Sequence, residues 1–348
     1  MNPIQQIAQL FAPKYPVATI QNLGNGLIND TFLVTTEAEC FVLQRINQHV
    51  FPAPELIAEN LVILSQHVKE IAHAQLKIPM ILKTAADTPY FKDDNGDYWR
   101  AQSFIDNSES LETIRTLADA EAAGFALGHF HRLLSDLDPM RLNDTLPGFH
   151  IATDYLRRYY QVAALTTKSQ PFCAHFIDQH QVLAETLETA KQQGLLPIRV
   201  IHGDPKLNNF LFDKDSQKII SLIDLDTVKP GLVHYDIGDC IRSCCHVLAN
   251  NTFDMDICEA ILKNYLREAS AFFSAQDYQY LFPSIQLIPF ELGIRFYTDY
   301  LEGNRYFKVT DPEQNLFRAI AQFELCAEIT RHEAEIQTLI KSLTALTA

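Results

Sequence analysis

The N-terminal part of the chain alternates short apolar runs with polar turns, which is the pattern of β-strands. Runs at 18–23 and 31–35 flank a Gly-Asn-Gly turn, and a third run covers 40–46. Residues 4–12 have the spacing of a short amphipathic helix, and a second helix is expected over 54–68. The pattern therefore predicts a small β-rich region in this part of the chain.

Beyond residue 104 the periodicity is mainly helical, and we place a boundary there between two lobes, 1–104 and 105–348. Apolar residues recur at helical spacing over four stretches, 113–137, 151–194, 255–277 and 313–346. Short apolar runs at 198–201 and 219–223 interrupt them and are predicted to be strands. The expected fold class is α+β, with a small β-rich N-lobe and a larger, mainly helical C-lobe.

Composition narrows the class of partner. The chain has 348 residues, of which 47% are hydrophobic, so it can bury a large core and fits one protein of two lobes better than two independent domains. A net charge of −15 without a basic stripe argues against a nucleic-acid partner. The apolar segment at 4–12 is too short and too polar for a signal peptide or membrane span, so we expect a cytoplasmic protein without a membrane partner.

The seven cysteines agree with a reducing compartment, because their number is odd and no Cys-x-x-Cys pair occurs. Cys240, Cys244 and Cys245 share one helical run with His246. A fourth ligand at suitable spacing is missing, so these cysteines are interpreted as small core residues and not as a zinc site.

The stretch 200–226 (VIHGDPKLNNFLFDKDSQKIISLIDLD) concentrates polar groups at strand ends. Asp204 follows an apolar run in a His-Gly-Asp turn, where a strand end can hold a carboxylate rigidly and leave it accessible. Asn209 comes five residues later, and Asp224 ends a further strand-like segment. An Asp and an Asn at this interval, followed by a metal-binding Asp, are the groups that phosphoryl transfer needs from a protein.

Phosphoryl transfer requires alignment of an acceptor hydroxyl and neutralisation of the charge on the phosphoryl oxygens. We assign Asp204 as the base, and Asn209 and Asp224 as ligands that hold Mg²⁺ against the nucleotide phosphates. Asp226 projects to the same face as Asp224 and could share the metal or contact substrate. His202 is expected to form hydrogen bonds within the catalytic loop, because the base role is already filled.

These motifs resemble those of the aminoglycoside phosphotransferase and choline kinase family, which shares the bilobal fold of protein kinases. The resemblance rests on His202-Gly203-Asp204 with Asn209, on Ile-Asp-Leu-Asp at 223–226, and on 236–242 (DIGDCIR), 295–303 (RFYTDYLEG) and 24–34 (GNGLINDTFLV). It spans almost the whole chain and is strongest toward the N-acetylhexosamine kinases. It implies a protein-kinase-like fold, ATP and Mg²⁺ as cofactors, and phosphorylation of a sugar hydroxyl to give a sugar 1-phosphate.

The resemblance also assigns nucleotide contacts. Gly24 and Gly26 allow the backbone to approach phosphates closely, and Asn29 and Thr31 can add side-chain donors. The adenine is expected against the hinge, near the backbone of Gln102 to Phe104.

The third strand, FVLQRIN at 41–47, lacks the lysine that the kinase pattern places there. The resemblance puts Gln44 at or near that position, with Arg45 on the opposite strand face. Which residue contacts the α- and β-phosphates stays open. Glu59 falls where the partner of such a cation would lie, although a surface role is nearly as good an interpretation.

Candidate substrate contacts lie in the C-lobe, where the resemblance points to Arg295, Asp299, Glu302 and Tyr306. Arg295 is the first choice, and an internal salt bridge to Asp299, four residues along the same helix, is an equal alternative. Asp236 opens a helix before a glycine and is expected to brace the catalytic loop.

Three functions remain open. Leu27 and Gly203 depart from the residues expected of a hexosamine kinase, so an aminoglycoside- or choline-type kinase is the alternative to a sugar kinase. The missing third-strand lysine also suggests a nucleotide-binding pseudokinase. The complete set of Asp204, Asn209 and Asp224 argues against the pseudokinase.

Overall fold

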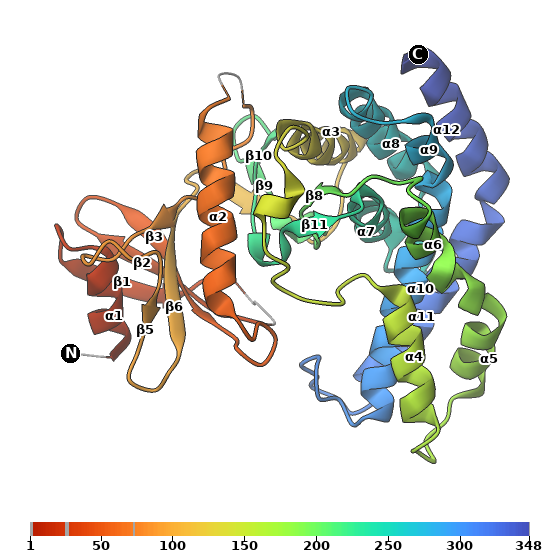
Figure 1. Ribbon diagram of the computed structural model, residues 1–348, viewed down its shortest axis with the longest axis horizontal. Helices are drawn as coiled ribbons and strands as arrows, with labels where there is room; N and C mark the ends of the chain where they lie inside the picture. Colours follow the sequence, from red (N-terminus) through yellow and green to blue (C-terminus); the bar gives the residue numbers. More distant parts are fainter. Residues whose placement is uncertain (1–2, 25–27, 72–73, 348) are drawn as a thin grey trace.

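The computed structural model describes residues 3–24, 28–71 and 74–347 (Figure 1). A sheet-rich N-terminal part and a larger helical C-terminal part lie side by side. This arrangement confirms the predicted α+β fold with two lobes.

The N-terminal sheet contains the strands that the sequence predicted. Its strands are β1 (Val17–Asn22), β2 (Asp30–Thr36), β3 (Cys40–Ile46), β4 (Ile81–Leu82), β5 (Phe91–Lys92) and β6 (Tyr98–Ser103). They run antiparallel in the order β1-β2-β3-β6-β4, with β5 also paired to β6. Helix α1 (Pro3–Phe11) covers the sheet and buries Ile7 and Phe11 in one core with Val34, Phe41 and Trp99.

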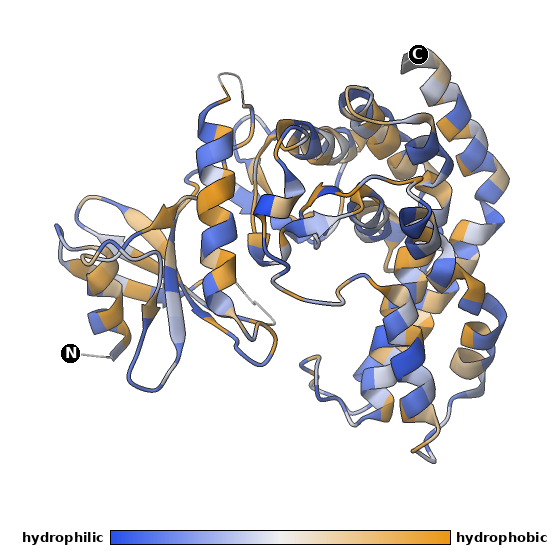
Figure 2. Cartoon of the chain, in the orientation of Figure 1, coloured by the Kyte–Doolittle hydropathy of each residue, from blue (hydrophilic) through white to orange (hydrophobic). Residues whose placement is uncertain are grey.

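Helix α2 (Pro54–Lys69) follows β3 and stands between the sheet and the rest of the molecule (Figure 1). Figure 2 shows hydrophobic and hydrophilic turns alternating along it, as expected of a helix with one buried face. The buried side chains Ile57, Leu61 and Leu64 belong to the core of the C-terminal part and not to that of the sheet. The α2 helix is therefore anchored to the C-terminal lobe.

The C-terminal lobe is mainly helical, as predicted. Its α-helices are α3 (Leu117–Leu133), α4 (Ala152–Ala163), α5 (Pro171–His180), α6 (Thr186–Gln192), α7 (Val233–Cys245), α8 (Met255–Ala269), α9 (Ala275–Gln279), α10 (Leu281–Leu301), α11 (Gln314–Arg331) and α12 (Glu333–Thr347). The helix expected over 113–137 begins only at Leu117, because the side chain of Thr116 caps it and accepts a hydrogen bond from the Asp119 N–H. None of the helices in the described ranges is long and apolar enough to cross a membrane.

Two glycines allow helices α3 and α8 to pack closely. A Cβ atom on Gly124 would lie 2.2 Å from the carbonyl oxygen of Ile261, and one on Gly128 would lie 2.8 Å from that of Tyr265. Neither position has room for a larger residue. The apolar residues around this contact belong to the same core as Phe210, Phe212 and Leu222 of the 200–226 stretch.

Short strands carry the polar motifs of the 200–226 stretch. Strand β8 (Arg199–Ile201) pairs with β11 (Lys229–Gly231), and β9 (Phe210–Asp213) lies between β10 (Ile219–Leu222) and β7 (Ser108–Ser110). A separate hairpin is formed by β12 (His246–Val247) and β13 (Thr252–Phe253). The strands predicted at 198–201 and 219–223 are thus confirmed, and the loops at their ends form the candidate active site.

Candidate active site

The turn at residues 202–204, called the catalytic turn below, follows β8. It packs against the short 3₁₀-helix η4 (Leu225–Thr227). Gly203 has φ +88°, and a Cβ there would lie 2.7 Å from the carbonyl oxygen of Thr227. The Thr227 hydroxyl donates to the carbonyl oxygen of His202 at 2.9 Å. Glycine is therefore required at position 203 both by conformation and by space.

Asp236, in the first turn of α7, holds the catalytic turn in place through hydrogen bonds. Its carboxylate accepts hydrogen bonds from the backbone N–H groups of His202 (2.6 Å) and Gly203 (2.9 Å). His131 lies 2.9 Å from the same carboxylate. Complete burial acts to raise the pKa of Asp236, but the interactions with His131 and His202 together outweigh it and the pKa lies below its usual value. The predicted bracing role of Asp236 is confirmed.

His202 forms hydrogen bonds within the loop, as predicted. Its Nε2 donates to the carbonyl oxygen of Ile223 at 3.0 Å, while Nδ1 accepts from the Asp204 N–H at 3.3 Å. Burial lowers the pKa of the imidazole, so this neutral tautomer is the stable one.

His150 contacts the carbonyl oxygen of the turn, a role that the sequence analysis did not predict. Its Nε2 lies 2.6 Å from the carbonyl oxygen of Gly203, and its Nδ1 lies 3.0 Å from Oε1 of Glu291. Burial acts to lower the pKa of His150, but Glu291, the Gly203 carbonyl and Asp239 together outweigh it and the pKa lies above its usual value. Because both nitrogens face acceptors, the doubly protonated imidazolium satisfies both contacts.

Asp204 and Asn209 lie together at the end of the turn. The Asn209 Nδ2 donates to the carbonyl oxygen of Asp204 at 2.7 Å, which leaves its Oδ1 as the atom that can bind a metal ion. The ammonium of Lys206 lies 2.5 Å from Oδ2 of Asp204. Burial acts to lower the pKa of Lys206, but the carboxylates of Asp204 and Asp224 outweigh it and the pKa lies above its usual value. Lys206 is thus a site cation that the sequence interpretation did not single out.

Asp224 follows β10 in a left-handed conformation (φ 62°, ψ 48°), which is uncommon for a residue with a side chain. The carboxylate reaches solvent, yet the surrounding protein displaces enough water to raise its pKa to about 6. Lys206 opposes this rise, whereas Asp226 and Asp204 add to it. Such a group is suited to a cation, whose charge would stabilise the ionised form.

A buried network of hydrogen bonds surrounds Asp226. Arg100 on β6 forms an ion pair with Oδ1 of Asp226, and Asn29 donates to Oδ2 at 2.7 Å. Both oxygens therefore already accept from protein donors, and a metal-binding role for Asp226 stays a prediction. Asn29, predicted to contact phosphates, instead donates to Asp226 and accepts from the Asn47 N–H at 3.0 Å.

The same network takes up Thr31 and Gln44. The Gln44 Nε2 donates to the Thr31 hydroxyl at 3.1 Å, and its Oε1 accepts from Arg100 Nε (3.1 Å) and Nη2 (2.7 Å). Arg45 points away and pairs with Asp30 at the surface. Glu59 accepts from Asn143 at 3.1 Å and is not a partner for a cation on β3. Thr31 and Gln44 thus contact protein groups here, and direct phosphate contacts from them stay predictions.

The remaining nucleotide contacts stay predictions. Gly24 has φ +69° in the β1–β2 connection, which suits glycine, whereas Gly26 and Leu27 lie outside the described residues. Gln102 is half-buried in β6 and Phe104 directly follows that strand. The described residues hold no cluster of three His, Cys, Asp or Glu that could bind a metal alone. Asn209 with Asp224 instead suits an ion completed by phosphates.

Arg295, the first-choice substrate contact of the sequence prediction, lies among aromatic rings. The guanidinium carbon lies 5.0 Å from the ring centre of Phe149, 5.1 Å from Tyr155, 5.6 Å from Phe307 and 6.0 Å from Tyr306. Among the described residues, Arg295 makes no hydrogen bond or ion pair with protein. Burial acts to lower the pKa of Arg295, but Tyr155, Tyr306, Glu291 and Asp204 together raise it above its usual value. Arg295 is therefore a cation whose donors are available to a ligand near the catalytic base.

Asp299 has a structural role in this structure, and its predicted substrate contact stays a prediction. Its Oδ1 accepts from the backbone N–H groups of Arg305 and Tyr306, both at 2.8 Å. Its Oδ2 accepts from the Phe307 N–H at 3.0 Å and from Asn315 at 2.9 Å. The salt bridge to Arg295 does not form. Asp299 instead shapes the loop that places the Tyr306 and Phe307 rings against Arg295.

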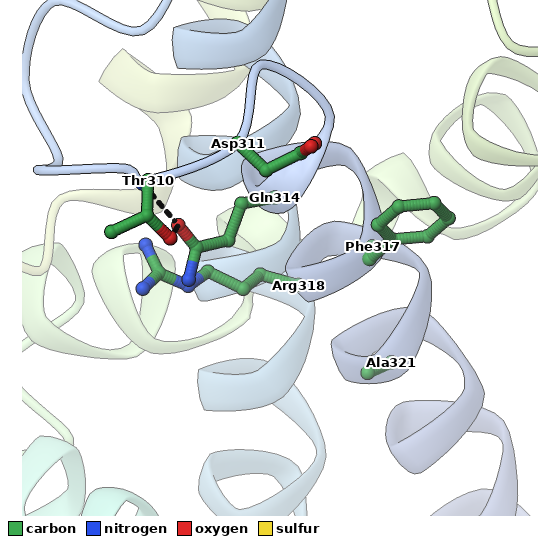
Figure 3. A pocket seen from close by; sticks show the side chains of 6 residues that line it. All are labelled: Thr310, Asp311, Gln314, Phe317, Arg318 and Ala321. Atoms are coloured by element: carbon green, nitrogen blue, oxygen red, sulfur yellow. Dashed lines mark hydrogen bonds between the residues drawn. The ribbon is translucent and has the colours of Figure 1, made fainter.

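A surface hollow at the start of α11 is a separate feature. It is lined by Thr310, Asp311, Gln314, Phe317, Arg318 and Ala321 (Figure 3). The Gln314 Oε1 accepts from the backbone N–H of Thr310 at 2.8 Å, so part of its polar lining is already paired. None of these residues belongs to the site described above.

The fold and the paired Asp204, Asn209 and Asp224 define a phosphotransferase of the protein-kinase type. The sequence model of the phosphotransferase enzyme family (APH) matches residues 19–280. The chain therefore belongs to that family, and it is a small-molecule kinase with a hydroxyl group as acceptor. The predicted family is confirmed, whereas closeness to the N-acetylhexosamine kinases stays a prediction.

Solved structures share the fold at low identity. A microcompartment-associated aminopropanol kinase is 16% identical, with a TM-score of 0.66 over 95% of this chain and 98% of that chain. A spectinomycin phosphotransferase in complex with ADP and spectinomycin is 14% identical, with a TM-score of 0.59 over 95% and 98%. An amicoumacin kinase in complex with AMP-PNP and Ca²⁺ is 14% identical, with a TM-score of 0.60 over 92% of each chain.

Proposed function

We propose that the chain is an ATP- and Mg²⁺-dependent sugar kinase, with an N-acetylhexosamine as the best candidate acceptor and a sugar 1-phosphate as product. Two of the similar kinases were captured with ADP or AMP-PNP, one of them with Ca²⁺. Residues 1–104 form the nucleotide-binding lobe in this proposal, and residues 105–348 form the lobe that binds the acceptor.

Asp204 accepts the proton of the acceptor hydroxyl as its oxygen bonds to the γ-phosphorus, and the bond from that phosphorus to the β–γ bridging oxygen breaks. Asn209 and Asp224 are the residues that would hold Mg²⁺, which neutralises phosphate charge when bound. Lys206 positions the Asp204 carboxylate through their 2.5 Å contact. Asp236 and His150 hold the turn from its two sides, so the base needs little reorganisation during transfer.

The observation that carries the sugar assignment is the unpaired guanidinium of Arg295. A fixed cation on the acceptor side repels the ammonium group of an amino alcohol or an aminoglycoside. Its donors instead suit hydroxyl, ring and acetamide oxygens. The rings of Phe149, Tyr155 and Phe307 supply the apolar walls that small-molecule sites combine with a few polar groups.

The direct test is an ADP-release assay with Mg-ATP and a panel of N-acetylglucosamine, N-acetylgalactosamine, other free sugars, choline, homoserine and an aminoglycoside. We expect turnover on an N-acetylhexosamine and a loss of at least about 1000-fold in Asp204→Asn with nucleotide binding intact. Turnover on amines alone would favour the aminoglycoside- or choline-type alternative. Nucleotide binding without turnover on any compound would favour the pseudokinase.

The role of Arg295 has its own test. In Arg295→Met the apolar volume is kept and the donors are lost, so KM for the sugar should rise about tenfold or more while KM for ATP stays unchanged. Arg305→Met is the matched control, because Arg305 is exposed on the adjoining loop. Equal sugar KM values in wild type and Arg295→Met would remove Arg295 from the acceptor site.

A further inference from the structure

We infer that Arg100 is the residue that binds the α- and β-phosphates of the nucleotide, the task for which β3 offers no lysine. This inference rests on the proposed function, because it takes a nucleotide as the phosphoryl donor. It assigns the cation to β6, one strand away from its expected place.

The strand register puts Arg100 beside the position of the missing lysine. Gln44 on β3 is directly opposite Arg100 on β6, so their side chains share one face of the sheet. The Gln44 Oε1 accepts from two nitrogens of Arg100, at 3.1 and 2.7 Å. The residues on either side of Arg100, Trp99 and Ala101, face the core under α1 instead. Gln44 thus orients the guanidinium toward the catalytic strands.

One buried nitrogen of Arg100 has no hydrogen-bond acceptor among the described residues, which is energetically unfavourable. The side chain is 3% exposed, and within the described residues Nη1 makes no hydrogen bond. An unpaired buried donor on a charged group is unfavourable, whereas a phosphate oxygen is an acceptor of the right charge and geometry. The guanidinium pairs with Asp226, which is two residues along the chain from the predicted metal ligand Asp224. Nη1 is therefore a donor at the metal-binding end of the site.

Asp226 explains how the cation is held. It pairs with Nη2 of Arg100 and accepts from Asn29, which follows the Gly-rich turn. This pair neutralises the guanidinium charge while leaving Nη1 for a ligand. The alternative is that Arg100 only ties the sheet to the η4 segment. The two roles predict different affinities. Only a phosphate-binding Arg100 contributes to the affinity for ADP without contributing to that for adenosine.

The test compares affinities for adenosine and ADP by isothermal titration calorimetry of the full chain. Titrations in EDTA keep the metal out, so a change cannot come from a disturbed metal site. If Arg100 binds phosphate, Arg100→Gln should weaken ADP binding about 10- to 100-fold and change adenosine binding less than about twofold. Arg45→Gln is the matched control, because it removes one positive charge from the opposite face of the same sheet.

Arg100→Gln leaves Asp226 buried and unpaired, which can unfold a protein. The double variant Arg100→Gln/Asp226→Asn removes both charges and is measured alongside it. A selective loss of ADP affinity in a folded variant supports the inference. Unchanged affinity for ADP, or equal losses for ADP and adenosine, overturns it.

The outcome separates this inference from the proposed function. If the wild type binds neither ADP nor Mg-ADP, the kinase proposal fails and the assignment of Arg100 fails with it. If the wild type binds ADP and Arg100→Gln binds it equally well, only the assignment of Arg100 fails. The choice of acceptor does not enter these titrations.

Discussion

At the scale of single residues, the site depends on how the catalytic turn is held. Asp236 bonds the two backbone N–H groups of the turn, and His150 contacts the carbonyl oxygen of Gly203 at 2.6 Å. Each of these supports is itself oriented, Asp236 by His131 and His150 by Glu291. The position of Asp204 therefore depends on two buried hydrogen-bonded pairs that do not touch it.

We expect activity to fall at alkaline pH because of His150. Its pKa is raised above 6.5, so the support from the imidazolium is complete below that value and is lost as pH rises through the folded-state pKa. The groups that face it are Glu291 on α10, the stacked ring of Tyr235 on α7, and the charge of Asp239. The measurement is the pH profile of kcat.

His150→Gln keeps at most one of the two contacts and should lower kcat about tenfold while removing the alkaline decline. His175, on helix α5, shows no comparable pairing, and His175→Gln serves as the control. A profile with the same alkaline limb in wild type and His150→Gln would show that another group titrates.

The sequence predicted those site residues that are close together along the chain. Asp204, Asn209 and Asp224 follow from intervals within one stretch, and Asp236 from its place at a helix start. Arg100 and His150 were missed because their partners lie 126 and 53 residues away. The available signal was the alternation along the strand. Trp99 and Ala101 are apolar and face one side, so Arg100 between them must face the other side. The loop-capping role of Asp299 was not predicted, because a carboxylate that caps a loop looks the same in sequence as one that binds substrate.

At the scale of elements, the α3–α8 contact supports the catalytic strands. Periodicity predicted both helices, but the distance between them depends on Gly124 and Gly128, whose missing side chains periodicity does not register. Helix starts were likewise displaced, since the cap at Thr116 fixes where α3 begins.

Gly124→Ala tests this contact. The added Cβ would lie 2.2 Å from a backbone oxygen that cannot move without shifting α8. We expect a loss of more than about 2 kcal/mol in the free energy of unfolding, despite the better helix propensity of alanine. Urea denaturation measures it, with Glu121→Ala on the exposed face of α3 as the control. Equal stability of the two variants would show that the helices can separate at little cost.

At the scale of the whole molecule, the two hydrophobic cores are not formed by two consecutive parts of the chain. The sheet and α1 share one core, whereas α2 packs into the core of the C-terminal lobe. Asn60 on α2 also donates to the carbonyl oxygens of Asn143 and Val228, both at 2.9 Å. Chain order alone would assign α2 to the N-terminal lobe, because the sequence does not say against which neighbour an amphipathic helix packs.

Hydrogen exchange should reveal this division. We expect the amides of α2 to become exchangeable at the same urea concentration as those of α3 and α8. This concentration should be higher than the one at which the amides of β1 and β2 begin to exchange. Mass spectrometry of peptides from each element provides the measurement. Exchange of α2 together with β1 and β2 would instead place it in the same cooperative unit as the sheet.

The loop held by Asp299 lies on a different part of the chain from the groups that carry out the proposed phosphoryl transfer. Arg295 and Asp299 lie one turn apart on α10, and the carboxylate of Asp299 fixes the rings of Tyr306 and Phe307 around Arg295. The chemical groups come from residues 200–226, on other elements. Substitutions or insertions in the loop can therefore exchange one acceptor for another while the transfer chemistry is left intact, which makes acceptor choice an independently evolvable trait.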